Sequence, residues 1–316
     1  MTERPAVIAC AISGALADRE QCPAIPYTPA EYAAEARRIV EEGGVHIHIH
    51  ARRPDGAPSY EVEDFRAIHD AIRAEIGSAA ILNFSTGTIG VPVSTRVAYL
   101  RACPPEVAAL NMGSMNYAKY SSRRRDFVFK TVFANPFEEI VELLKAMNEL
   151  GIKPEHECFD LGHVGSLPPL IEMGVLKTPL HVDFVMGVLG GVPPSARNLA
   201  AMADNLPPGE HHWSIVGIGR AQWSLVAAAL TLGGSVRVGL EDNFYLPDGE
   251  MARSNGDLVT QARALVTSTG RRVATVEEAR EMLGVRPLGQ MSATSPAAGS
   301  PQSGDTGSLA GGGSDR

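Results

Sequence analysis

Eight short apolar runs alternate with helical patterns along this chain, and this alternation constrains the fold more than any other feature. The runs occupy residues 6–12, 45–51, 79–85, 106–112, 153–160, 180–186, 212–218 and 235–240. Amphipathic helices are predicted at 29–42, 61–76, 136–150, 195–204, 222–231, 255–269 and 275–283. Eight strands that alternate with helices over roughly 250 residues are typical of a (β/α)₈ TIM barrel, an α/β fold. A doubly wound sheet is the alternative, although it would usually show fewer strands.

The composition is that of a globular protein with a large core. The chain has 316 residues, of which 44% are hydrophobic and 20% charged, and its formal net charge is −8. This acidic balance gives no indication of a nucleic acid or an anionic membrane as partner. Four scattered cysteines predict free thiols, and the sequence shows neither a signal peptide nor a membrane-spanning run. We therefore expect a soluble, cytoplasmic protein.

The end of the chain differs from the rest in composition. From residue 289 it is rich in Gly, Ser, Ala and Pro and has almost no large apolar side chain. Such a segment cannot bury enough surface to offset its chain entropy. We therefore divide the chain into a barrel domain at 1–288 and a disordered C-terminal tail at 289–316.

Three histidines occupy every second position of the second predicted strand: His46, His48 and His50. Side chains alternate along a strand, so the histidines share one face and the intervening isoleucines share the other. In a barrel the histidines would face the interior. His48 and His50 lie nearer the C-terminal end of the strand, where barrel enzymes keep their catalytic groups. His46 lies one layer deeper and is predicted to be structural.

A lone interior histidine is usually a hydrogen-bonded core residue, but a pair at a strand end beside carboxylates favours a metal site. Glu241, at the end of the eighth strand, is the third candidate ligand. Two histidines and one carboxylate leave coordination positions open, as a Lewis-acidic Zn²⁺ requires. Fe²⁺ uses the same ligand set and is the rival metal.

Other polar residues have two interpretations each. Asp242 is either a surface acid or a base that Arg237, five residues earlier, keeps ionised and oriented. The glycine turn at 217–220 falls where barrels often bind phosphate, although tight packing explains its glycines equally well. The arginines at 123–125 form either a solvated surface run or a contact with the phosphates of a bulky anionic cofactor.

Taken together, the strand ends resemble those of the β-keto acid cleavage enzymes over about residues 6–285. The resemblance rests on these segments in this order: AISGA (11–15), HIHARRPDGAPS (48–59), NFSTG (83–87), LNMGSMNY (110–117), PEHECFDLGH (154–163), HVDFVMGVLGG (181–191), VGIGR (216–220) and VRVGLEDN (236–243). No single segment is specific, but the ordered combination is.

The resemblance implies a Zn²⁺-bearing TIM barrel, usually a homotetramer, that uses acetyl-CoA as co-substrate. Such enzymes convert a β-keto acid and acetyl-CoA into acetoacetate and a new acyl-CoA by a retro-Claisen step. It implies His48, His50 and Glu241 as metal ligands and Arg237 with Asp242 as the catalytic pair, supported by Glu157. The residues expected to bind substrate are Ser85, Thr86, Gly87, Ser114 and Asn116. Those expected to bind CoA are Gly217, Gly219 and Arg220.

One position departs from the family pattern. In the aminohexanoate enzymes, a glutamate after the first strand pairs with the substrate's amino group, whereas this chain has Leu16 there. An apolar side chain would leave an ammonium group desolvated and unpaired, which is costly. We therefore predict that Leu16 contacts a substrate tail that is uncharged.

Two other classes of protein remain as alternatives. A zinc hydrolase of the amidohydrolase kind would carry its His-x-His pair on the first strand, not the second, and would use histidines such as His163 and His181. A non-catalytic protein with a structural metal would usually have a closed, thiolate-rich site, whereas no cysteine adjoins these candidate ligands.

Overall fold

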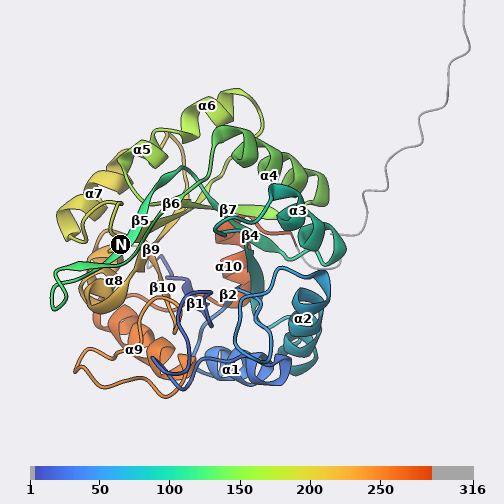
Figure 1. The fold of residues 1–316 in the computed structure, drawn as a ribbon. Coiled ribbons are helices and arrows are strands. Elements are labelled where there is room, and N and C mark those ends of the chain that lie inside the picture. The colour runs from blue at the N-terminus through green and yellow to red at the C-terminus, as the bar shows by residue number, and fades with distance from the viewer. Residues whose placement is uncertain (1–3, 287–316) are drawn as a thin grey trace, which may run out of the picture.

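A closed barrel of eight parallel strands forms the centre of the computed structural model, which describes residues 4–286 (Figure 1). The strands are β1 Ile8–Ala11, β2 His46–Ile49, β3 Ile81–Ser85, β4 Val107–Asn111, β7 Lys153–Cys158, β8 His181–Met186, β9 His212–Gly217 and β10 Ser235–Val238. They follow one another around the barrel in chain order, and β10 pairs with β1 to close it. The predicted TIM barrel is confirmed, and each predicted apolar run contains one of these strands.

Helices form the outer layer of the barrel, and all seven predicted ones are present. They are α1 Pro29–Glu41, α2 Val62–Ile76, α3 Val93–Ala102, α4 Phe137–Leu150, α5 Leu161–Val164, α6 Leu167–Glu172, α7 Ala196–Asp204, α8 Gln222–Thr231, α9 Asn255–Ser268 and α10 Val276–Leu283, with a 3₁₀ turn, η1, at Gly219–Ala221. Helix α1 begins with a capping box between Thr28 and Glu31 and with Pro29 in its first turn. Helices α3, α5 and α6 were not predicted.

A two-stranded antiparallel hairpin interrupts the barrel pattern between β4 and α4. Its strands are β5 Met115–Ser121 and β6 Asp126–Phe133, and the sequence pattern did not lead us to expect them. Ala118 on β5 bridges to Leu189 in the loop after β8, so the hairpin lies at the C-terminal end of the barrel strands. The arginines at 123–125 form the exposed turn of the hairpin, where Arg125 has a φ of 53°.

Helix α10 closes the opposite, N-terminal end of the barrel. Its Ala279 and Leu283 pack in one apolar cluster with Val7, Val45 and Ile81, which lie at the starts of neighbouring strands. Figure 1 shows α10 within the ring of strands, away from the outer layer of helices. The floor of the barrel is therefore apolar and sealed.

Above this floor the barrel interior is unusually polar. Barrel interiors are normally filled by branched aliphatic side chains. Here His46 on β2 contacts Glu155 on β7, and Arg237 on β10 contacts Glu157 on β7. These strands are not neighbours in the sheet, so the contacts cross the interior.

Three further expectations concern the cysteines, membrane-spanning helices and the C-terminal tail. All four cysteines are buried and unpaired. No helix in the described part of the chain is long and apolar enough to cross a membrane. The predicted disordered tail at 289–316 lies outside the described residues.

Candidate active site

The three predicted metal ligands converge at the C-terminal end of the barrel. His48 is on β2, His50 follows that strand, and Glu241 follows β10. One ligand atom from each lies within 4.8 Å of the others. His48 Nε2 is 3.7 Å from Glu241 Oε2, and His50 Nε2 is 3.4 Å from Glu241 Oε1. We call this group the rim cluster.

Two glycines allow Glu241 to reach the histidines. The chain turns after β10 at Gly239, whose φ is +134°, and a Cβ there would lie 2.2 Å from the Ala11 carbonyl oxygen. The Glu241 N–H then donates to that same oxygen at 3.2 Å. Gly14, with a φ of +60°, passes so close that a Cβ would lie 2.8 Å from Glu241 Cγ. Positive φ and close approach together favour glycine at both positions.

The rim cluster fits a divalent cation. His48 Nε2 and Glu241 Oε2 are buried and have no hydrogen-bond partner among the described residues, although buried polar atoms are normally paired. Imidazole and carboxylate donors suit divalent transition metals. The His50 and Glu241 side chains keep 14% and 18% of their surface exposed, so a substrate can reach the cluster from solvent.

Arg237 holds three carboxylates together beside the rim cluster. Its Nη1 donates to Glu157 at 3.0 Å, and its Nη2 donates to Glu241 at 2.9 Å. Asp242 accepts two bonds from it, from Nε at 3.0 Å and from Nη2 at 3.1 Å. When ionised, three carboxylates and one guanidinium leave two negative charges, which a divalent cation would balance.

The pKa of Glu241 differs in direction from those of the other two carboxylates. Burial, opposed by Arg237 and reinforced by Glu241, raises the pKa of Asp242 to about 7. Burial likewise raises the pKa of Glu157 to about 7 against the effect of Arg237. Burial alone would raise the pKa of Glu241 too, but His50, His48 and Arg237 lower it well below its usual range. Before any cation binds, Glu241 is therefore ionised and Asp242 can exchange a proton near neutral pH.

The predicted substrate residues lie at strand ends around the same rim. Ser85 is buried, and its Oγ accepts the Gly87 N–H at 3.2 Å. The Thr86 hydroxyl donates to the Ala109 carbonyl at 2.6 Å, so it serves the backbone. Ser114 is exposed and accepts the Asn135 N–H at 2.7 Å, and Asn116 is also exposed.

Of the residues predicted to bind CoA, only Arg220 offers an exposed side chain. A Cβ on Gly217 would lie 2.7 Å from Gln222 Cα, so tight packing accounts for that glycine. Gly219 has a φ of +68°, and its N–H donates to the Asp242 carbonyl at 2.8 Å. This turn therefore helps to fix the backbone of Asp242.

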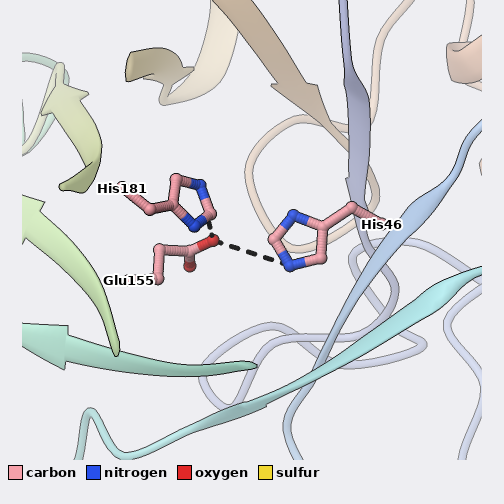
Figure 2. Close-up of side chains that lie close together, drawn as sticks. All are labelled: His46, Glu155 and His181. Carbon is pink, nitrogen blue, oxygen red and sulfur yellow. Dashed lines mark ion pairs between the residues drawn. The ribbon is translucent and has the colours of Figure 1, made fainter. Parts of the chain in front are cut away.

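A second group of titratable side chains lies deeper in the barrel and was missed as a group. It brings together His46, Glu155 and His181, and the ligand atoms lie within 4.8 Å of one another (Figure 2). His46, predicted to be an inner support, faces Glu155. The alternation of Glu155 with Glu157 and of His181 with Asp183 was a signal that these side chains point inward.

The histidines that kept the hydrolase alternative open serve other contacts. His181 belongs to this deeper group. His163 accepts the Phe159 N–H at 3.2 Å and packs against the ring of the same residue. Among the described residues, no candidate metal-binding group combines His163 or His181 with His50 and Glu241.

The fold and the rim cluster define a (β/α)₈-barrel enzyme with a candidate site for a divalent cation. A family model described as beta-keto acid cleavage enzyme matches residues 5–285. The chain belongs to this family.

Individual relatives agree with the family match. A 3-keto-5-aminohexanoate cleavage enzyme from Fusobacterium nucleatum is 36% identical over 280 residues, which cover 89% of this chain and 98% of that protein. A 3,5-dioxohexanoate:acetyl-CoA acetone transferase from Paraburkholderia graminis is 35% identical, with 89% and 96% covered. The solved apo structure of ObcA has a TM-score of 0.68 at 21% identity, covering 83% of this chain and 66% of that one, and this likeness shows the fold.

Proposed function

We propose that this protein condenses a β-keto acid with acetyl-CoA and releases acetoacetate and a new acyl-CoA. The observation that carries the proposal is the convergence of His48, His50 and Glu241 beside the Arg237–Asp242 pair. It occurs in a chain that belongs to the β-keto acid cleavage enzymes. The family match does not support the hydrolase alternative.

The metal ligands of the proposal are His48, His50 and Glu241, and the metal we propose is Zn²⁺. The ion, when bound, would supply Lewis-acid stabilisation of the negative charge that develops on the substrate oxygens. The unpaired buried atoms of His48 and Glu241 support this assignment. Because His50 and Glu241 are partly exposed, the site has room for substrate on its open side.

The remaining residues position the substrate and move a proton. Asp242 removes a proton from the carbon between the ketone and the carboxylate, and the two bonds from Arg237 orient its carboxylate. Ser85 and Ser114 hold the substrate carboxylate, with Gly87 and Asn116 beside them, and Thr86 supports this strand end through its bond to the Ala109 carbonyl. Glu157 contacts Arg237 at 3.0 Å and thereby positions the catalytic pair.

The new carbanion attacks the carbonyl carbon of acetyl-CoA, and the CoA thiolate leaves. The thiolate then adds to the former ketone carbon of the substrate. The bond between that carbon and the deprotonated carbon breaks, which releases acetoacetate after protonation and leaves the substrate tail as an acyl-CoA. We propose the turn of Gly217, Gly219 and Arg220 as the CoA site, with the exposed Arg220 side chain as the contact to the phosphates and the two glycines shaping the turn that carries it.

Leu16 leads us to propose that the substrate tail is uncharged. Leu16 is 61% exposed near the start of the loop that follows β1, and the same loop carries Gly14 against Glu241. An amino substrate would find no counter-charge from Leu16. The physiological tail would then be apolar or neutral.

We further propose a homotetramer in the cytoplasm. The β5–β6 hairpin exposes large apolar side chains at Phe127, Val128 and Val132, and exposed apolar groups favour association. Size-exclusion chromatography with light scattering tests the tetramer.

The function is tested by incubating the protein with acetyl-CoA and a panel of β-keto acids and measuring acetoacetate. We expect acetoacetate and the matching acyl-CoA in equal amounts, with neutral tails preferred. Glu241→Gln is the control that should abolish product. Product formed without acetyl-CoA would instead support a hydrolase.

A further inference from the structure

A second cluster of imidazoles and carboxylates lies deeper in the barrel than the rim cluster, because His46 precedes His48 by two residues along β2. His46 comes from β2, Glu155 from β7 and His181 from β8. Glu155 Oε2 is 3.7 Å from His46 Nε2 and 3.4 Å from His181 Nε2. Figure 2 shows both rings directed at this one carboxylate oxygen. We call these three residues, with Asp183, the inner cluster.

We propose that the inner cluster binds a second divalent transition-metal ion, which is distinct from the rim ion and retained within the barrel. His46, Glu155 and His181 each offer one ligand atom, and these atoms lie within 4.8 Å of one another. Asp183 lies beside them, with its Oδ1 3.6 Å from His181 Nε2. Two imidazoles and one carboxylate form a donor set that suits Zn²⁺. This inference does not depend on the proposed function.

The distances between the donors favour a metal ion over a water molecule. Tetrahedral Zn²⁺ with ligands at about 2.0–2.1 Å separates neighbouring ligand atoms by about 3.3 Å. A water that accepts or donates bonds of about 2.8 Å at tetrahedral angles would separate its partners by about 4.5 Å. The separations of 3.4 and 3.7 Å between Glu155 Oε2 and the two imidazole nitrogens lie near the first value.

Buried polar atoms of the inner cluster also lack hydrogen-bond partners. His46 Nε2, Glu155 Oε2 and Asp183 Oδ2 are buried and have no hydrogen-bond partner among the described residues. The His46, Glu155 and His181 side chains are at most 2% exposed, so bulk water does not satisfy them. Leaving buried polar atoms unpaired is unfavourable, and metal ligation would remove that cost.

Hydrogen bonds from neighbouring side chains hold both carboxylates in place. Asn83 Nδ2 donates to Glu155 Oε1 at 2.7 Å, which leaves Oε2 directed at the imidazoles. The Ser214 hydroxyl donates to Asp183 Oδ1. Such contacts around ligating carboxylates are typical of metal sites in which outer hydrogen bonds orient the ligands.

The inner carboxylates have no positively charged side chain paired with them. Within the described residues, Glu155 and Asp183 form no ion pair with lysine or arginine. A divalent ion would balance the charge of these carboxylates, and neutral imidazole is the form that binds a metal.

Counting the ions bound per chain tests the proposal. The full chain is expressed with Zn²⁺, purified without chelator and analysed by inductively coupled plasma mass spectrometry against protein concentration. In the rim-null variant, His50→Ala/Glu241→Gln, His48 is the only rim ligand left. We expect two ions per chain in the unaltered protein, one in the rim-null variant, and none when His181→Asn is added to it.

A matched control replaces a different buried imidazole of the same layer. The ring of His212 lies 5.4 Å from that of His181 but belongs to neither cluster. Adding His212→Asn to the rim-null variant should therefore leave one ion. If rim-null/His181→Asn fails to fold by circular dichroism, rim-null/Glu155→Gln replaces it, and Co²⁺ absorption reports the inner donors directly.

A folded rim-null protein that holds no ion would overturn the proposal. So would an ion that survives His181→Asn or Glu155→Gln in the rim-null background, because it would be bound elsewhere. Acetoacetate production is measured separately. An inactive protein that holds two ions refutes the proposed function and supports the inner ion.

Discussion

The rim cluster and the inner cluster use the same side-chain types in opposite surroundings. At the rim, Arg237 contacts every carboxylate, and His50 and Glu241 remain partly exposed. In the inner cluster, Glu155 contacts neutral imidazoles and is 1% exposed. The rim can therefore exchange ligands with solvent, whereas the interior cannot.

This difference separates a reactive role from a structural one. A catalytic metal site needs an open position and nearby groups that move protons, which only the rim offers through Asp242. A buried metal site instead contributes to folding stability. Glu155 links the two, because its Oε1 lies 3.8 Å from His48 Nδ1.

The largest expected effect comes from replacing His48 on β2, and the matched comparison is His46, two positions earlier on the same strand. His48→Ala should remove the rim ion and lower kcat/KM by at least about 10³-fold, because charge stabilisation in the reaction is lost. His46→Ala should keep the rim ion and lower mainly the stability against urea. Metal content and kcat/KM are measured for both variants. Loss of the rim ion in His46→Ala to the same extent as in His48→Ala would show that the two clusters are not separate.

Removing the proposed base tests whether proton transfer belongs to the rim. Asp242→Asn keeps the size of the side chain and should lower kcat by about 10²–10⁴-fold, the contribution of a general base. The metal content should stay unchanged, since Asp242 is not a proposed ligand. Asp248→Asn, in an exposed turn, is the control and should retain full activity. An active Asp242→Asn would move the base to another residue.

The sequence contained enough to place the rim cluster. The β/α alternation predicts the barrel, and strand alternation separates His48 from Ile47 and Ile49. Residues at the C-terminal ends of barrel strands meet at one rim whatever their distance along the chain. For this reason Glu241 could be joined with His48 before any coordinates were known.

The inner cluster could not be placed in the same way. Alternation shows that Glu155 and His181 point inward, but not at which height they lie relative to His46. That height depends on the stagger of the strands, which pairs Glu155 with Ala109 and His46 with Ile81. The β5–β6 hairpin was missed because its strands form a separate sheet, outside the repeating barrel pattern.

Alanine substitutions at two glycines with positive φ can distinguish backbone strain from a steric clash with the rim cluster. Gly14→Ala and Gly90→Ala both force alanine into left-handed backbone, at about 1–3 kcal/mol. The added Cβ meets Glu241 Cγ at 2.8 Å in Gly14→Ala and nothing within 4 Å in Gly90→Ala. We expect Gly14→Ala alone to weaken rim metal binding, by about tenfold, as for altered outer contacts. Equal metal affinity in both variants, measured by competition with a chelating dye, would contradict this.

The smallest expected effect concerns the substrate tail. Leu16→Glu places a carboxylate on the loop beside the rim cluster, where a substrate ammonium could pair with it. Because the Leu16 side chain is 61% exposed, such a pair is screened by solvent and is worth about 0.2–1 kcal/mol. The ratio of kcat/KM for an amino tail to that for a neutral tail should rise by about 1.4- to fivefold. Leu16→Gln, similar in size but uncharged, is the control and should leave the ratio near its original value. An unaltered protein that already prefers the amino substrate would show that Leu16 does not select the tail, although the rim chemistry would be unaffected.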